Sequence, residues 1–206
     1  MKTFFYGIAG FTVLAVGLAF TTPLGEIATV IALNQVETTK FQVKGYVLIM
    51  NGEINSKTLD QFENIIEAHP NIKTLREVEV PGSLDDDTMI PLAYRVRELG
   101  LNTELLATSK IYSGGVDLFL AGVNRVATEG AEIGVHSWSD GVKEAVDYPR
   151  DAPEHEANRA YIEKMLGDDA FYWFTITAAP ADDIHVMTRE EIEEYGLLTE
   201  PMRKAQ

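Results

Sequence analysis

The sequence contains no cysteine, and this absence excludes several kinds of chemistry at once. Disulfides, a thiol nucleophile, a zinc site with cysteine ligands and a lipid-modified N-terminal cysteine all require a thiol. Histidine is also scarce: the chain has four, and no two of them have the spacing of metal ligands. The sequence therefore predicts no metal site and no cofactor.

Basic residues are few relative to acidic ones. The 206 residues include 17 Lys and Arg against 32 Asp and Glu, which gives a formal net charge of -15. A surface that binds nucleic acid or anionic lipid needs a basic patch, and the sequence shows none. We therefore expect no nucleic-acid partner, and we interpret the charge as that of a solvated surface.

Long apolar runs are absent except at the N-terminus. There, "MKTFFYGIAGFTVLAVGLAF" has one Lys and then an apolar run from Phe4 to Phe20. The length of this run lies between the apolar region of a signal peptide (roughly 7–15 residues) and a membrane-spanning helix (about 20 residues). We predict a signal peptide or an inner-membrane anchor over residues 1–22, and hence an exported protein, periplasmic or anchored and facing outward. A buried core helix is the alternative.

A linker is expected over residues 23–40 and one folded domain over 41–206. In this domain strand and helix patterns alternate. Strands are expected over 41–50, 72–82, 101–109 and 131–138, and helices over 56–68, 85–100 and 154–166, with a short strand and a final helix over 183–198. This alternation predicts an α/β domain with a mainly parallel sheet, in which function gathers in the loops beyond the carboxyl ends of the strands.

The stretch "KIYSGGVDLFLAG", residues 110–122, has the pattern of a strand end, a tight turn and a helix start. Ser113 lies in the turn and is followed by Gly114 and Gly115. The glycines either let two elements pack closely or clear space so that Ser113 can meet a substrate. The turn by itself leaves both explanations open.

A serine nucleophile needs a base to take its proton and a third group to orient that base. His136 closes a predicted strand and is the candidate base, although a core histidine satisfied by the backbone fits the same pattern. His69 and His155 are most simply solvated surface residues. His185 stands one residue into an apparent strand.

Four motifs in order, "VPGS", "IYSGGVDLFLAG", "AEIGVHSW" and "DDIHVMTREEIEEYGL", carry a resemblance. Together they resemble the proteolytic subunit of Clp protease, within the crotonase-like superfamily, and more closely its exported bacterial relatives. The resemblance covers about residues 43–199. It implies a crotonase/Clp-protease-like fold of repeated strand-helix units, a peptide or protein substrate, and a homo-oligomer.

The resemblance also assigns roles to residues. The nucleophile falls on Ser113 and the base on His136, and the aspartate falls near the start of "DDIHVMT". An ungapped count back from "EYGL" ends on Ile184, so a shift of one residue is needed to choose Asp183, and Asp182 is the fallback. The resemblance thus implies a triad of Ser113, His136 and Asp183.

The oxyanion hole implied by the resemblance uses two backbone N–H groups, those of Ser83 and Gly114. Ser83 stands where the family has a second glycine after Pro81-Gly82, and Asp117 stands where the family has an apolar residue. We interpret Asp117 as a first-turn helix acid, and Asp85, Asp86 and Asp87 as a solvated cap.

Three functions remain open at this point. The leading hypothesis is a serine hydrolase, peptidase-like, that acts outside the cytoplasm. The alternative is a non-catalytic envelope protein that uses the fold for assembly or for binding a partner. An acyl-CoA enzyme ranks last, because the acidic chain lacks an obvious basic site for the CoA phosphates. The aromatic run Phe171–Phe174 is interpreted as buried core rather than an interface or the mouth of a cleft.

Overall fold

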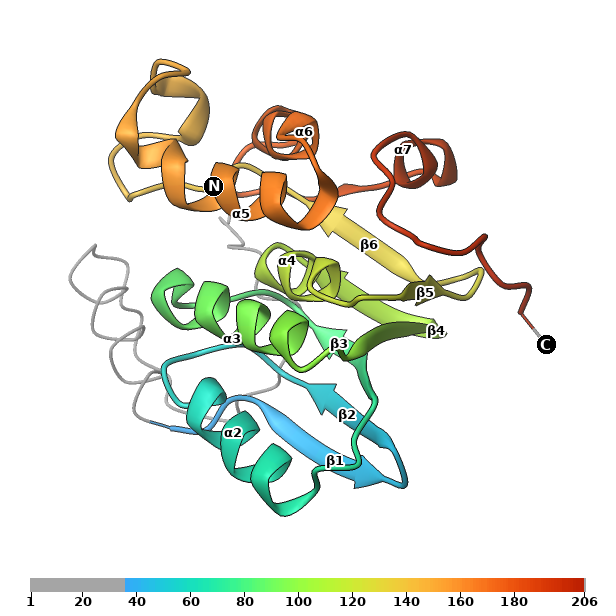
Figure 1. Cartoon of the computed structure of the whole chain (residues 1–206). Coiled ribbons are helices and arrows are strands. Elements are labelled where there is room, and N and C mark those ends of the chain that lie inside the picture. The colour runs from blue at the N-terminus through green and yellow to red at the C-terminus, as the bar shows by residue number, and fades with distance from the viewer. Residues whose placement is uncertain (1–35, 206) are drawn as a thin grey trace, which may run out of the picture.

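The computed structural model describes residues 36–205, and the predicted signal peptide or anchor lies outside them. Within the described residues, no helix is long and apolar enough to cross a bilayer. The strands are β1 (Lys40–Lys44), β2 (Val47–Asn51), β3 (Thr74–Val80), β4 (Asn102–Tyr112), β5 (Arg125–Ala127), β6 (Glu132–Val135) and β7 (His185–Val186) (Figure 1). The α-helices are α2 (Thr58–Ala68), α3 (Asp86–Glu98), α4 (Gly114–Leu120), α5 (Glu156–Leu166), α6 (Ala170–Ala178) and α7 (Arg189–Glu194), with short 3-10 turns at Ala145–Asp147 and Pro153–His155.

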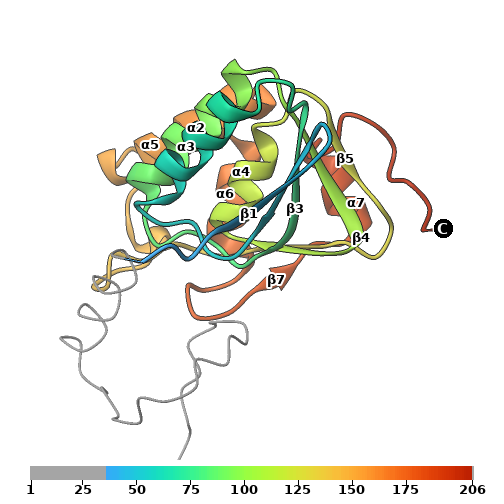
Figure 2. The same ribbon diagram turned by 90° about the horizontal axis from the view of Figure 1, so that it is seen from below.

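The strands form one mixed sheet in the order β1-β2-β3-β4-β6-β7, with β5 also paired to β4. The four pairings among β2, β3, β4, β5 and β6 are parallel, whereas β1–β2 and β6–β7 are antiparallel. The sheet is therefore parallel in its centre, as the alternation predicts, and antiparallel at both edges. Helices α2, α3 and α4 lie along the same face of this sheet (Figure 2).

The predicted strand over residues 41–50 is wrong in one respect, because the chain makes a hairpin there. Strands β1 and β2 pair with Lys44 opposite Val47, so that Gly45 and Tyr46 form a two-residue turn. Gly45 has φ of 59°, in the left-handed region that such turns require. The turn splits the expected strand into two.

The predicted helices are largely confirmed. Helix α2 begins at Thr58 rather than Ser56, because the Asn55 side chain accepts the N–H of Lys57 and the Thr58 hydroxyl accepts the N–H of Asn55. At α3 the Asp85 side chain accepts the N–H of Asp87, which confirms the expected cap. Helix α6 and strand β5 were not predicted.

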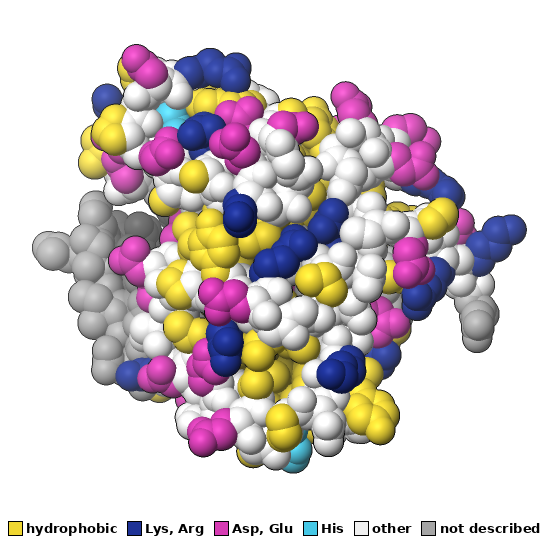
Figure 3. Space-filling view, viewed as in Figure 1, with side chains coloured by type: hydrophobic (Ala, Val, Ile, Leu, Met, Phe, Trp, Pro, Cys, Tyr) yellow, Lys and Arg dark blue, Asp and Glu magenta, His cyan; other side chains and the backbone are white. Residues whose placement is uncertain are grey.

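The core lies between the sheet and the helices on its covered face. Strand residues and helix residues that are fully or almost fully buried meet there, among them Leu48, Leu75, Leu105, Phe62, Leu92 and Phe119. Phe171 and Tyr172 join this core and Trp173 and Phe174 pack half-buried against it, so the interpretation of the aromatic run as core is confirmed. On the face seen in Figure 1, acidic and basic side chains lie interspersed (Figure 3).

The carboxyl ends of three neighbouring parallel strands meet at one edge of the sheet. Strand β3 ends at Val80, β4 at Tyr112 and β6 at Val135, and β4 pairs with both of the others. The residues that follow these ends are Pro81, Ser113 and His136. The topology thus brings together three segments that are far apart in the sequence.

Candidate functional site

Ser113 stands in a strained turn between β4 and α4. Its φ is 50° and its ψ is -125°, and it is the single non-glycine residue with positive φ among the described residues. A side chain in this region costs free energy, and such residues persist where the surrounding structure holds them. A strained serine between a strand and a helix is the arrangement that exposes the nucleophile in many hydrolases.

The two glycines after Ser113 are required by packing. A Cβ on Gly114 would lie 2.6 Å from the Cβ of Ser83, and a Cβ on Gly115 would lie 2.6 Å from the carbonyl oxygen of Val80. Real Cβ atoms do not approach so closely, so the turn after β3 can touch the start of α4 only if these residues are glycine. The two explanations for the glycines, close packing of two elements and cleared space beside Ser113, therefore describe the same feature.

Two backbone N–H groups at the contact between Ser83 and Gly114 have no hydrogen-bond acceptor among the described residues. Ile54 donates its N–H to the carbonyl of Gly82, but the N–H of Ser83 has no acceptor among the described residues, and neither has that of Gly114. The Ser83 hydroxyl bonds with the backbone of Asp85, so it leaves the N–H of its own residue free. Two free N–H groups from two touching turns can stabilise an oxyanion.

His136 is held by a backbone carbonyl. Its Nδ1 lies 2.7 Å from the carbonyl oxygen of Ser137. A carbonyl can only accept, so Nδ1 carries the proton and Nε2 keeps its lone pair. This is the tautomer that a general base needs. The Ser113 hydroxyl makes no hydrogen bond with any described residue, and Ser113 and His136 line the same two hollows of the surface.

Asp183 has a partner other than His136 in the structure. It is exposed, it lines neither hollow, and its carboxylate accepts the N–H of Ile184 at 2.8 Å. No hydrogen bond joins it to His136 within the part of the chain that the structure describes. Asp182 lines the wider hollow, again without a bond to His136. The place of Asp183 in a triad thus stays a prediction.

The pairing of β6 with β7 explains this placement. Val135 is opposite His185, and side chains alternate between the two faces of a strand. Ile184 therefore falls on the face of Gly134 and His136. A Cβ on Gly134 would lie 2.7 Å from Cγ2 of Ile184, which places the isoleucine there. The ungapped count thus ends on a residue of this face, and Asp183 lies before β7, outside the paired register.

A small cavity of about 60 Å³ adjoins Ser113. Ser113, Gly114, Asp117 and His136 are part of its lining, with Tyr172 of α6 on another wall. A wider groove of about 950 Å³ opens beside it and is lined by Ser83, Ser113 and His136 among others. Ser113 and His136 thus stand where the cavity and the groove meet.

Asp117 is a first-turn acid of α4, as the sequence indicated, and it is also a half-buried residue of the cavity lining. Burial first and the charge of Asp86 second raise the pKa of its carboxyl to about 7. No described residue donates a hydrogen bond to the carboxylate, while the backbone carbonyl of Asp117 accepts the hydroxyl of Tyr161 at 2.6 Å. The acid therefore faces the cavity without a partner.

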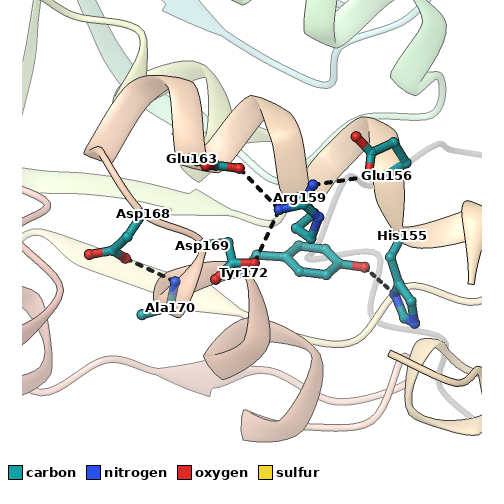
Figure 4. Close-up of polar contacts among 8 residues, drawn as sticks. All are labelled: His155, Glu156, Arg159, Glu163, Asp168, Asp169, Ala170 and Tyr172. Atoms are coloured by element: carbon teal, nitrogen blue, oxygen red, sulfur yellow. Dashed lines mark hydrogen bonds and ion pairs between the residues drawn. The ribbon is translucent and has the colours of Figure 1, made fainter. Parts of the chain in front are cut away.

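His155 is not the solvated residue that the sequence indicated. It is 1% exposed, and its Nδ1 lies 2.6 Å from the hydroxyl of Tyr172, as Figure 4 shows. The same hydroxyl accepts the indole N–H of Trp138 at 3.0 Å. In the same view Arg159 of α5 binds Asp169, directly before α6, which joins the two helices (Figure 4). Both helices contribute residues to the cavity lining.

Of the site residues that sequence reasoning missed, Trp138, Tyr161 and Tyr172 matter most. They line or support the cavity from segments that only the fold brings together. Trp138 follows His136 by two positions, which was the one local signal available. Among residues 36–205, no three His, Asp or Glu side chains gather as metal ligands would.

Comparisons with known proteins bear on the fold. No family model matches the sequence, and no curated protein matches it significantly. A membrane-bound stomatin-specific protease, solved as a mutant in complex with a substrate peptide, has 21% identity and a TM-score of 0.54 over 78% of this chain and 74% of its own. A second mutant of that protease has 20% identity and a TM-score of 0.52 over 80% and 81%.

A third structure belongs to an enzyme of different chemistry. Methylmalonyl CoA decarboxylase, complexed with 2S-carboxypropyl CoA, has 9% identity and a TM-score of 0.51 over 83% of this chain and 69% of its own. These likenesses show the fold. The chain has a mixed α/β fold like that of the stomatin-specific protease and of methylmalonyl CoA decarboxylase.

Proposed function

We propose that this protein is a serine peptidase in which Ser113 is the nucleophile and His136 the base. One observation carries the proposal: a strained serine at a strand end stands beside two unpaired backbone N–H groups and lines the same cavity as a histidine of the required tautomer. The likeness to a stomatin-specific protease in complex with a peptide supports a peptide as the substrate class.

The steps follow from these groups. The Ser113 hydroxyl attacks the carbonyl carbon of a peptide bond while His136 Nε2 takes its proton, and the N–H groups of Ser83 and Gly114 hold the oxyanion. His136 then gives the proton to the leaving amine, and an acyl-enzyme remains. Water attacks the ester, His136 takes the proton of the water, and the collapse of the second oxyanion returns a proton to Ser113 and releases the acid.

The third member of the site is a carbonyl rather than a carboxylate in this proposal. The carbonyl of Ser137 fixes the tautomer of His136, but it carries no full charge to stabilise an imidazolium. We expect a slower hydrolase than one with a complete triad. We also propose that the protein acts outside the cytoplasm and self-associates, on the sequence of residues 1–22 and on the resemblance respectively.

The test is labelling with a fluorophosphonate, which reacts with activated serines. We expect labelling of the full chain, none for Ser113→Ala and at most a trace for His136→Ala. Circular dichroism of the two variants checks that they fold. Equal labelling of the full chain and of Ser113→Ala, or none of either, contradicts the proposal.

The second candidate is the non-catalytic envelope protein. Two observations favour it: Ile184 lies on the face of Gly134 and His136, and an acid, Asp117, lines the same cavity as Ser113. It predicts that cells carrying Ser113→Ala keep the biological role of the protein. The acyl-CoA enzyme has less support, because no Lys or Arg is among the described residues that line the cavity or the groove.

A further inference from the structure

The cavity beside Ser113 has room for the end of one side chain. Its volume of about 60 Å³ is roughly four times the 10–15 Å³ that one water needs on the same measure. A side-chain end of about four non-hydrogen atoms is therefore of suitable size. A lysine side chain has four such atoms beyond Cβ, whereas an arginine side chain has six.

The walls of the cavity suit an aliphatic stem. Val116 of α4, Val135 of β6 and Ile162 of α5 are buried residues that contribute apolar surface to it. The polar groups of two lining tyrosines are already engaged, since Tyr161 donates its hydroxyl to the carbonyl of Asp117 and Tyr172 bonds with Trp138 and His155. Apart from Ser113 and His136 of the proposed catalytic pair, the ionisable groups that remain in the lining are the acids Asp86 and Asp117.

The acid that faces this space is Asp117, one helical turn beyond Ser113. Its carboxylate has no hydrogen-bond donor among the described residues, although burial makes an unpaired charge costly. Asp86, the other lining acid, accepts the amide of Asn158 at 3.4 Å. No described lining residue is Lys or Arg, so a cation from outside is the group that would pair with Asp117.

The groove that leads to the cavity has the same charge. Five acids line it and no described Lys or Arg does; the acids are Asp85, Asp86, Asp87, Glu144 and Asp182. A cleft lined by charge of one sign raises the local concentration of ligands of the opposite sign. The approach to Ser113 thus favours a positively charged peptide.

We propose that this cavity is a specificity pocket for a lysine side chain, with Asp117 as the counter-ion of its ammonium group. Ser113 and Gly114 form part of the cavity wall, so a lysine whose side chain fills the cavity has its own carbonyl beside Ser113. Ser113 therefore attacks that carbonyl, and the peptide is cleaved on the C-terminal side of the lysine. This inference rests on the proposed peptidase function for its catalytic meaning. Binding of lysine in the pocket can be tested without catalysis.

The binding arm uses the full chain with Ser113→Ala, so that nothing is cleaved. Acetyl-Ala-Ala-Lys-amide is compared with the same peptide ending in norleucine, which has no charge, by titration calorimetry at about pH 8, where Asp117 is ionised. We expect the lysine peptide to bind at least tenfold more tightly. Adding Asp117→Asn removes this preference, whereas adding Asp60→Asn, an exposed acid of α2, leaves it unchanged.

The reaction arm uses the unmodified active site. Diphenyl phosphonates with a lysine or a norleucine side chain are compared for their rates of Ser113 modification, together with a neutral fluorophosphonate. We expect the lysine phosphonate to react at least tenfold faster, and Asp117→Asn to bring the ratio close to one. The fluorophosphonate rate of each variant, by which both phosphonate rates are divided, corrects for any change in the nucleophile itself.

The two arms separate the two proposals. Equal binding of lysine and norleucine peptides overturns the pocket, even if fluorophosphonate labels Ser113. A lysine preference in binding that depends on Asp117, without any labelling of Ser113, upholds the pocket and overturns the peptidase. Loss of the preference in Asp60→Asn as well would overturn the assignment to Asp117.

Discussion

The carbonyl oxygen of Ser137 lies 2.7 Å from Nδ1 of His136, where a serine-histidine-aspartate site has a carboxylate. The carbonyl belongs to the residue next to the histidine, so the orientation of the ring is set locally, within one short loop. The N–H of Ser137 in turn donates to the carbonyl of Ala179, which ties this loop to the end of α6. The base is thus held by backbone alone.

Adding a carboxylate on the face of His136 should strengthen the base. Ile184 occupies that face, so Ile184→Asp is expected to raise the rate of fluorophosphonate labelling by roughly tenfold, because a negative charge stabilises the imidazolium. Ile184→Asn is the uncharged control and should leave the rate close to that of the wild type. A rise of the same size in both variants would mean that charge is not the cause.

Removing the charge of Asp183 should have little effect. The carboxylate is exposed and accepts the N–H of Ile184 instead of meeting His136. We expect Asp183→Asn to keep the labelling rate within about twofold of the wild type. A loss of 100-fold or more, measured under the same conditions, would restore the role that the resemblance gives to Asp183.

Gly114→Ala should damage both the fold and the site. The added Cβ would lie 2.6 Å from the Cβ of Ser83, so the two turns must separate, at a cost of roughly 1–3 kcal/mol in the free energy of unfolding. Urea unfolding measures the cost, and labelling should fall with it. Gly100→Ala is the control: a Cβ there meets open space although φ is 67°, so it should lower stability without slowing labelling.

Asp117 should make stability depend on pH. Its pKa is raised from 3.8 to about 7, so the folded state holds a proton that the unfolded state releases between these values, and its contribution to the free energy of unfolding falls as pH rises through this window. The upper bound is about 4 kcal/mol. Urea unfolding at about pH 4 and about pH 8 should show Asp117→Asn to be less sensitive to pH than the wild type. Equal pH dependence of the two proteins would contradict this.

The hydroxyl of Tyr172 should matter for stability. It accepts the indole N–H of Trp138 and bonds with buried His155, so Tyr172→Phe removes this partner from the half-buried indole N–H and from the buried imidazole. We expect a loss of roughly 1–3 kcal/mol in the free energy of unfolding, measured with urea. Tyr46→Phe, at an exposed turn, should change it by less than about 0.5 kcal/mol.

Local signals predicted much of the fold. The acids at the start of α3 and Gly100 after its end marked both boundaries of that helix, and the strand ends at Tyr112 and Val135 placed Ser113 and His136 at one edge of the sheet. The hairpin of β1 and β2 was missed, because the two-residue turn Gly45-Tyr46 interrupts an otherwise continuous apolar strand pattern. Whether a short turn of this kind forms depends on how the two strands pair.

The features that escaped prediction depend on distant residues. His155 is buried by aromatic rings of Trp138, Trp173 and Tyr172, so no pattern around residue 155 could show it. The choice between Asp183 and Ile184 depends on the register between β6 and β7, which a count along one chain does not give. The charge state of Asp117 depends on burial by the elements packed around it, α4 and α5 among them.

The contact between Ser83 and Gly114 also gives a way to find ligands. The two free N–H groups belong to separate segments of the chain, one after β3 and one at the start of α4, so an anion bound to both bridges these two segments. A ligand that binds the folded state alone raises the unfolding temperature. Peptide boronates, whose anionic adduct with serine imitates the oxyanion, can therefore be ranked by thermal shift, before any substrate has been identified and without turnover.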